Sequence, residues 1–173
     1  MQVIDVSVEE NGIVLFDKDV ICHFYNDSID DGVNLFKRYI ETNEGEDVLN
    51  SGIILPILSI DDMGYDIIIK YDFESCDEEE YILFSNGVFP FYIKNKAIIA
   101  DLYSIINWDR NISTDYDVVD VSPGFYGVTV SGYRIDDKNG YILKAGYIFS
   151  FKKERKLPIL TGRTDISMRL IDL

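Results

Sequence analysis

Histidine and cysteine are the first residues to consider for catalysis, and the chain holds few of them. His23 is the single histidine, so a Ser-His-Asp triad has one possible base and zinc sites that need several histidines are excluded. Its neighbour Cys22 lies in the same apolar run at 20–25, which we interpret as a strand, and neighbouring residues on a strand point to opposite faces. We therefore expect a surface or structurally satisfied His23, not a catalytic base.

The two cysteines, Cys22 and Cys76, show no spacing typical of a disulfide framework, and they are too few for a cysteine-rich zinc site. Free thiols are the prediction, and a bridge between the two is the alternative.

Two groups of aspartates could approach a hard cation. They are Asp61, Asp62 and Asp66 in the first half of the chain, and Asp115, Asp117 and Asp120 in the second. The first group resembles the start of a calcium loop, but the Asp-x-Asp-x-Asn-Gly order and the closing glutamate are missing. We interpret both groups as solvated turns or strand ends, and predict no metal and no cofactor.

The densest charge lies at 74–80, where five of seven residues are acidic. These five are Glu74, Asp77, Glu78, Glu79 and Glu80. Such a run often serves only as a solvated loop. The functional interpretation is an anionic patch that, with Asp61 and Asp62, contacts a basic protein, for instance the phosphate-binding cleft of a nuclease. Complementary charge accelerates association and selects partners, so these seven residues are the predicted partner-binding site.

The overall charge favours a basic protein as the partner over a nucleic acid or an anionic membrane. The net charge is −15, and residues 1–80 hold 21 acidic and 4 basic residues. Nucleic acids and anionic membranes attract Lys and Arg, so neither is expected as the main partner. The sequence has no run of about 18 apolar residues and begins without the features of a signal peptide. We expect a cytoplasmic protein.

Three Asn-Gly pairs between apolar runs predict hairpin turns, because this dipeptide suits the positive φ angles of a two-residue loop. Asn11-Gly12 would join strands at 2–8 and 13–17, Asn86-Gly87 strands at 80–85 and 88–94, and Asn139-Gly140 strands at 130–136 and 141–150. Further strands are predicted by short runs rich in Ile, Val, Tyr and Phe. These runs are 20–25, 52–58, 65–72, 97–103, 117–121 and 165–171.

One main helix is predicted at 28–40, where Ile29, Val33, Phe36 and Ile40 recur at helical spacing after a possible N-cap at Ser28. The segment 98–107 could form either a helix or a buried strand, and its periodicity does not separate the two.

The expected fold follows from these elements. About ten short strands rich in aromatic residues predict a mostly-β protein, in which two antiparallel sheets pack as a sandwich or form an open barrel. The helix would cover one edge or end. We expect one β-rich domain over 1–173.

Three segments carry a resemblance. Phe89-Pro90-Phe91-Tyr92-Ile93, the apolar run at 97–100, and the segment 120–130 with its Pro-Gly turn are similar to the second half of the competence-J family of DNA-entry nuclease inhibitors. The chain also looks like polymorphic-toxin immunity proteins in size, acidity and β-richness. It differs from the competence-J family in length and in its C-terminal segment 157–173. The resemblance implies an inhibitor, and no individual residue is carried over from it.

The sequence thus predicts an acidic inhibitor or immunity-type protein, without enzymatic activity, that binds and neutralises a basic partner such as a nuclease toxin. The alternative is a β-sandwich module, either structural or binding a sugar or another small ligand. That alternative is motivated by the aromatic content and would require a concave cleft lined by aromatic side chains.

Overall fold

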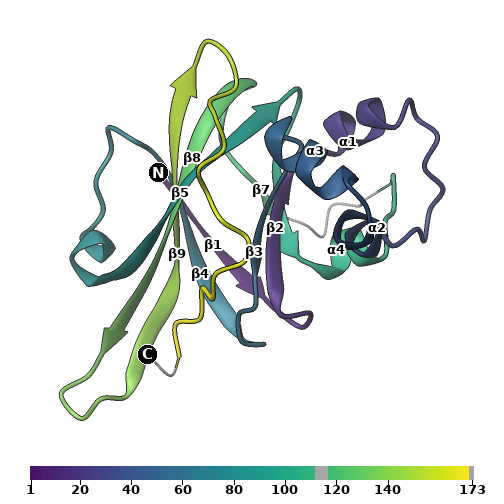
Figure 1. Cartoon of the computed structure of the whole chain (residues 1–173). Coiled ribbons are helices and arrows are strands. Elements are labelled where there is room, and N and C mark those ends of the chain that lie inside the picture. Colours follow the sequence, from purple (N-terminus) through teal and green to yellow (C-terminus); the bar gives the residue numbers. More distant parts are fainter. Residues whose placement is uncertain (112–116, 172–173) are drawn as a thin grey trace.

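The computed structural model describes residues 1–111 and 117–171, and it contains two β-sheets and a layer of helices (Figure 1). The larger sheet has the strand order β1-β4-β9-β8-β5. Its strands are β1 (Gln2–Ser7), β4 (Gly64–Tyr71), β9 (Ile142–Glu154), β8 (Gly124–Asp136) and β5 (Ile82–Ile93). Neighbouring strands are antiparallel except β4 and β9, which run parallel.

The smaller sheet is antiparallel and has the order β3-β2-β6-β7. Its strands are β3 (Ile54–Leu58), β2 (Gly12–Phe16), β6 (Ile98–Asp101) and β7 (Asp117–Val118). Side chains of both sheets form one buried cluster between them, for example Ile13 and Leu15 of β2 with Phe149 and Phe151 of β9. The prediction of a mostly-β, two-sheet sandwich is therefore confirmed, and the sheets do not close into a barrel.

Short helices cover the outer face of the smaller sheet (Figure 1). They are α1 (Lys18–Phe24), α2 (Leu35–Glu41), α3 (Glu44–Asn50) and α4 (Tyr103–Ile106). Strand β2 is buried on both faces because Val14 and Phe16 pack against the helices while Ile13 and Leu15 face the other sheet. Within the described residues, none of the helices is long and apolar enough to cross a membrane.

The prediction of one main helix over 28–40 is wrong in its boundaries. The helix α2 begins after Asn34, whose side chain accepts a hydrogen bond from the amide of Lys37 at 2.7 Å. Ser28 does not begin a helix, and its hydroxyl donates to the carbonyl of Tyr25 at the end of α1. Asn34 satisfies one of the free amides at the helix start, so the cap fixes the start there. The residues before it form a loop in which Gly32 has φ +82°.

The predicted core face of this helix is also only partly correct. Ile29 is buried, but it lies in the loop before the helix, and Val33 and Phe36 are half-buried. Ile40 is 65% exposed. Leu35 and Tyr39 supply the buried face of α2 instead.

The segment 20–25, predicted as a strand, lies almost wholly in the helix α1. Asp17 is the reason, because one oxygen of its buried carboxylate caps the helix by accepting from the amide of Asp19 at 2.9 Å. The other oxygen accepts from the amides of Lys94 and Asn95, in the turn between β5 and β6. The turn at 94–95, far from α1 in the sequence, therefore helps to hold the carboxylate that starts this helix.

The ambiguous segment 98–107 contains both elements in succession. It is strand β6 up to Asp101 and helix α4 from Tyr103, and the Asp101 carboxylate accepts from the amide of Tyr103 at 2.7 Å where the change occurs. The strand predicted at 117–121 is shortened to β7, and the strand predicted at 165–171 is absent from that described segment.

One of the three predicted hairpins is confirmed. Asn139-Gly140 lies in the turn between β8 and β9, and Gly140 has φ +83°. The loop is longer than the two residues predicted, because the last strand pair is Asp136–Ile142. Asn11-Gly12 lies between β1 and β2, which belong to different sheets, so the chain changes sheets there. Asn86-Gly87 forms a bulge inside the continuous strand β5. The hairpin predictions at these two pairs are wrong, because the dipeptide also suits bulges and sheet changes.

The segment 157–171, which we call the strap, runs without regular structure across the sandwich (Figure 1, yellow). The amides of Thr161 and Gly162 donate to the carbonyl of Val88, both at 2.9 Å. Farther along, Met168 and Leu170 are buried in the cluster between the sheets. The strap therefore completes the core beside β5.

Gly87 explains how closely the strap can approach β5, and it gives the first prediction. A Cβ atom there would lie 2.3 Å from the carbonyl oxygen of Thr161. We expect Gly87→Ala to displace the strap and lower the free energy of unfolding by about 1–3 kcal/mol. Urea unfolding followed by the fluorescence of Trp108, the single tryptophan, would measure the loss.

Gly64→Ala is the matched control, because a Cβ atom at Gly64 meets nothing within 4 Å and its φ is not positive. Equal stability of the two variants would contradict the tight contact between the strap and β5.

Candidate partner-binding surface

The later part of the acidic run folds as a 3₁₀ turn, η1 (Asp77–Tyr81), on the outer face of the larger sheet. Beneath it Ile68, Tyr133 and Ile148, from three adjacent strands, form a small apolar cluster with the side chain of Cys76. Burial raises the pKa of the Cys76 thiol. The run is therefore packed against the sheet and is not the solvated loop of the simpler interpretation.

Lys70 holds the run from below. Its side chain is only 4% exposed, and its Nζ lies 2.9 Å from the carboxylate of Glu79 and donates to the carbonyls of Tyr71 and Glu74. A buried ammonium is costly unless it is paired and hydrogen-bonded. Glu79 and the backbone at 71–74 therefore have a structural role.

Lys144 of β9 forms a second anchor. Its Nζ lies 2.8 Å from the carboxylate of Glu78 and 3.1 Å from that of Asp66. The hydrogen bond with Lys144 lowers the pKa of Glu78, and the hydrogen bond with Glu78 is the main cause of a raised pKa at Lys144. Asp66 in turn raises the pKa of its cross-strand neighbour Asp5.

Glu74 is also paired within the chain. Its carboxylate accepts from the amide of Tyr71 at 2.7 Å and lies 3.2 Å from the N-terminal amine of Met1. The backbone hydrogen bond from Tyr71 is the main reason for the lowered pKa of Glu74. Three of the five acids of the run are thus neutralised by the protein itself.

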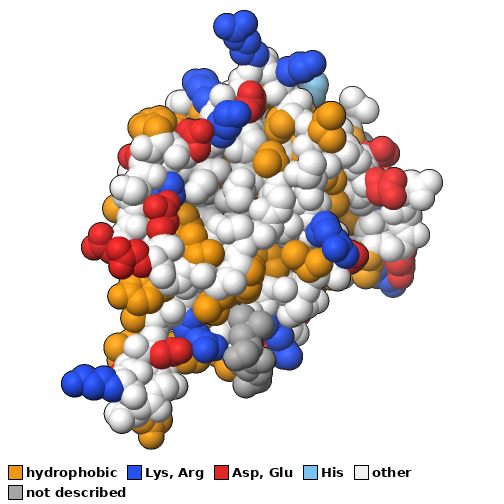
Figure 2. Space-filling view, turned by 60° about the vertical axis from the view of Figure 1, so that its left-hand side comes forward, with side chains coloured by type: hydrophobic (Ala, Val, Ile, Leu, Met, Phe, Trp, Pro, Cys, Tyr) orange, Lys and Arg blue, Asp and Glu red, His pale blue; other side chains and the backbone are white. Residues whose placement is uncertain are grey.

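Asp77 and Glu80 are the remaining two acids. Both side chains are exposed, and neither forms an ion pair within residues 1–111 and 117–171. Figure 2 shows acidic side chains near the left edge of this face, above the projecting β8–β9 hairpin, with hydrophobic side chains beside them. The anchored turn thus presents two free carboxylates to solvent.

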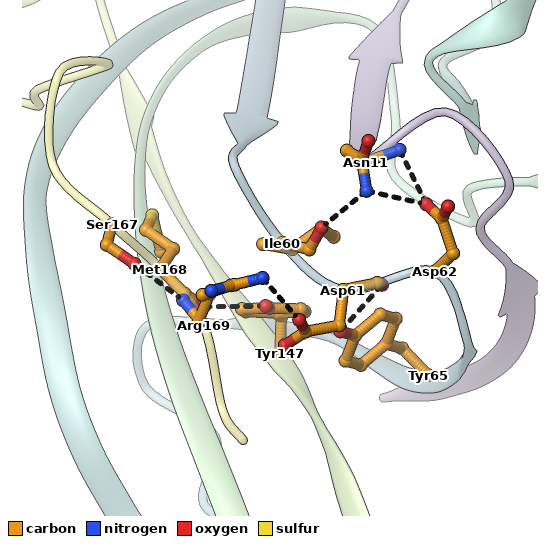
Figure 3. Close-up of polar contacts among 9 residues, drawn as sticks. All are labelled: Asn11, Ile60, Asp61, Asp62, Tyr65, Tyr147, Ser167, Met168 and Arg169. Carbon is orange, nitrogen blue, oxygen red and sulfur yellow. Dashed lines mark hydrogen bonds and ion pairs between the residues drawn. The ribbon is translucent and has the colours of Figure 1, made fainter. Parts of the chain in front are cut away.

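Asp61 and Asp62 occupy a different place, the turn between β3 and β4 (Figure 3). The Asp61 carboxylate lies 2.8 Å from the Arg169 guanidinium of the strap. The Asp62 carboxylate accepts from the backbone amide of Asn11 at 2.8 Å and from its side-chain amide at 2.9 Å. Since their described polar contacts join neither residue to 74–80, both serve to fasten the strap and the β1–β2 turn.

The aspartates considered for a cation do not come together. Asp66 pairs with Lys144, and Asp115 lies outside the described residues. Asp120 donates its backbone amide to the side chain of Gln2, and Asp117 is exposed on β7. Within the part of the chain that the structure describes, three or more potential metal ligands do not gather at any place.

His23 lies exposed on α1, in agreement with the expected surface histidine, although on a helix and not on a strand. Cys22 and Cys76 are both free thiols, as predicted. Burial raises the pKa of Cys22, which reduces the thiolate fraction that a nucleophile would need.

Sequence reasoning missed the exposed apolar side chains beside η1. The tripeptide Tyr-Ile-Leu occurs at 81–83, where η1 passes into β5, and again at 141–143, where β9 begins. All six side chains are exposed, and those of Tyr141 and Leu143 are 71% and 68% exposed. The signal was available, because three consecutive apolar residues on a strand cannot all point to one core.

The comparisons with known proteins return one similar structure to report. No family model matches the chain, and no curated protein sequence matches it. The crystal structure of ComJ, inhibitor of the DNA-degrading activity of NucA, from Bacillus subtilis, matches with a TM-score of 0.49 and 13% identity. The match covers 89% of this chain and 96% of ComJ.

The anchor at Glu78 gives a prediction for pH dependence. Its pKa lies below the ordinary value of 4.5, so the ion pair with Lys144 stabilises the fold above that pH and loses its effect as the pH falls through the folded pKa. We expect Glu78→Gln to lower the free energy of unfolding by about 1 kcal/mol at pH 7. The difference from the wild type should disappear at acid pH, as measured by urea unfolding across a pH series.

Glu80→Gln is the control, because Glu80 is exposed and has no ion pair within the described residues. A difference at Glu78 that persists unchanged below its pKa would exclude the ion pair as the cause.

Proposed function

We propose that the protein is a non-enzymatic, cytoplasmic inhibitor of the immunity type, which binds and neutralises a basic protein such as a nuclease. The observation that carries the proposal is the state of the acidic turn. Glu78 and Glu79 form ion pairs with lysines of the larger sheet. Asp77 and Glu80 are exposed to solvent and have no partner among the described residues.

Rigid placement makes these two carboxylates effective. A flexible acidic loop loses conformational entropy when it binds, whereas a turn already fixed by Lys70 and Lys144 loses less. The net charge of −15 adds a long-range field that attracts a basic protein and repels nucleic acid. A nuclease that binds phosphate through a cationic cleft has the complementary charge.

The contacts of the acidic side chains support a smaller binding set than the seven residues predicted from the sequence. Glu74, Glu78, Glu79, Asp61 and Asp62 each form an ion pair or a side-chain hydrogen bond. Within residues 1–111 and 117–171, Asp77 and Glu80 are exposed and form neither. The proposed contact therefore centres on these two residues. A test must leave Glu78 and Glu79 intact, since their replacement would also disturb the fold.

The double variant Asp77→Lys/Glu80→Lys tests the contact. Immobilised wild-type protein would first be used to capture proteins from its own host. A captured protein supports the proposal if mass spectrometry identifies it as basic and if the purified wild type suppresses its nucleic-acid cleavage at a stoichiometric ratio. For that pair we expect the double variant to associate about tenfold more slowly at low salt, with thermal stability unchanged.

Glu9→Lys/Glu10→Lys is the matched control, because both side chains are exposed and the net charge changes by the same amount. An equal effect of both double variants would assign the attraction to net charge alone. Capture of acidic proteins only, or uninhibited cleavage, would contradict the proposed function.

A second candidate function rests on a separate observation. A groove of about 310 Å³ lies between α2, α3 and β3, and its walls are mostly apolar, with Phe36 and Tyr39 as the aromatic side chains. A groove of this size and lining suits a small apolar ligand. It favours the alternative of a ligand-binding module, and calorimetry with a library of small sugars and apolar compounds would test it.

A further inference from the structure

One stretch of the larger sheet has an open edge. Strand β5 is an outermost strand, and its far side is covered at two places, by the strap at Val88 and by the carbonyl of Gly52, which accepts from the amide of Tyr92 at 2.8 Å. Within residues 1–111 and 117–171, the backbone at 82–85 forms hydrogen bonds to no strand other than β8. Among these residues, the outer side of the stretch therefore has unpaired backbone groups.

The open edge is apolar and exposed. Tyr81, Ile82 and Leu83 are 44%, 37% and 43% exposed. Natural sheets protect such edges with lysine, proline or a covering segment, because an open apolar edge pairs with other chains. Pro90 and the strap protect the later part of β5, but 81–85 contains neither lysine nor proline.

The second Tyr-Ile-Leu tripeptide lies at the same end of the sheet. Ile82 pairs with Tyr133 at the start of β5, and β8 and β9 continue beyond that point to the pair Asp136–Ile142. The pairing of β4 with β9 starts only at Gly146, so the hairpin projects past both neighbouring strands (Figure 1). The exposed side chains at 141–143 stand on this projection.

We infer that the open edge of β5 at 82–85 receives an extended segment of the basic partner as an added strand. Main-chain hydrogen bonds would supply affinity and flanking side chains specificity, as in other cases of strand addition. The apolar residues at 81–83 flank that segment and contact it, and Asp77 and Glu80 pair with its cationic side chains. This inference rests on the proposed function.

Charge decides between a partner and a second copy of this chain. Two copies joined along this edge would bring Asp77 and Glu80 of each toward the other, on molecules that carry −15 each. Like charges placed together at an interface cost affinity. A lysine- or arginine-bearing strand removes that cost, so the basic partner is the favoured occupant.

Hydrogen exchange on the complex with the captured basic nuclease tests the inference. We expect the amides at 82–85 to exchange at least about tenfold more slowly in the complex than in the free protein, as new backbone hydrogen bonds require. Leu83→Lys should weaken binding about tenfold or more. The control is Val3→Lys on β1, the opposite edge strand, where the side chain is 54% exposed and the charge change is the same.

The outcomes are distinct. If the complex forms and cleavage is inhibited while 82–85 exchange as before, or if Val3→Lys weakens binding as much as Leu83→Lys, the inference is wrong and the proposed function stands. If no basic protein is captured and inhibited, both the inference and the proposed function are wrong. If the amides at 82–85 of the free protein exchange more slowly as the protein concentration is raised, the edge pairs with a second copy of this chain. That result would overturn the inference.

Discussion

The buried ammonium of Lys70 is the constraint on which the proposed partner-binding surface depends. A charge that is 4% exposed on the outer face of a sheet needs an anion and several oxygens, and the following segment supplies them through Glu79 and the carbonyls at 71 and 74. To supply these oxygens, the chain after β4 turns back over the sheet. The turn η1 then packs on Tyr133 and Ile148, and the chain continues into β5. The free acids and the open edge are both consequences of that path.

Most strands were predictable from the sequence, whereas the bounds of α2 and the existence of α1 were not, for one physical reason. A short apolar run in a sequence predicts a strand. The smaller sheet is buried on both faces, so its strands and the helices that cover it are similar in apolar composition. What separates them is capping: Asp17 and Asn34 start α1 and α2 through single hydrogen bonds. In the case of Asp17, the same carboxylate also binds a turn more than seventy residues away.

The acidic run was visible in the sequence, but its division into anchors and free groups was not. That division depends on Lys70 and Lys144, and the pairing of Lys144 with Glu78 requires β9 to lie beside β4 in a parallel register, which local patterns do not encode. Asp61 and Asp62 were grouped with the run because they share its charge. Arg169 and Asn11, distant in sequence, give these two a structural role instead.

The length of the open edge follows from the same details. Bulges interrupt the pairing of β5 with β8 between Ile82 and Phe84 and again between Ser85 and Val88. Beyond the second bulge the strap covers the edge, and it can do so because Gly87 and Gly162 have no side chains. The open stretch is thus limited to a few residues. Such a short edge offers too few backbone bonds for stable pairing with an arbitrary chain, so flanking charge and apolar contacts must decide which segment binds.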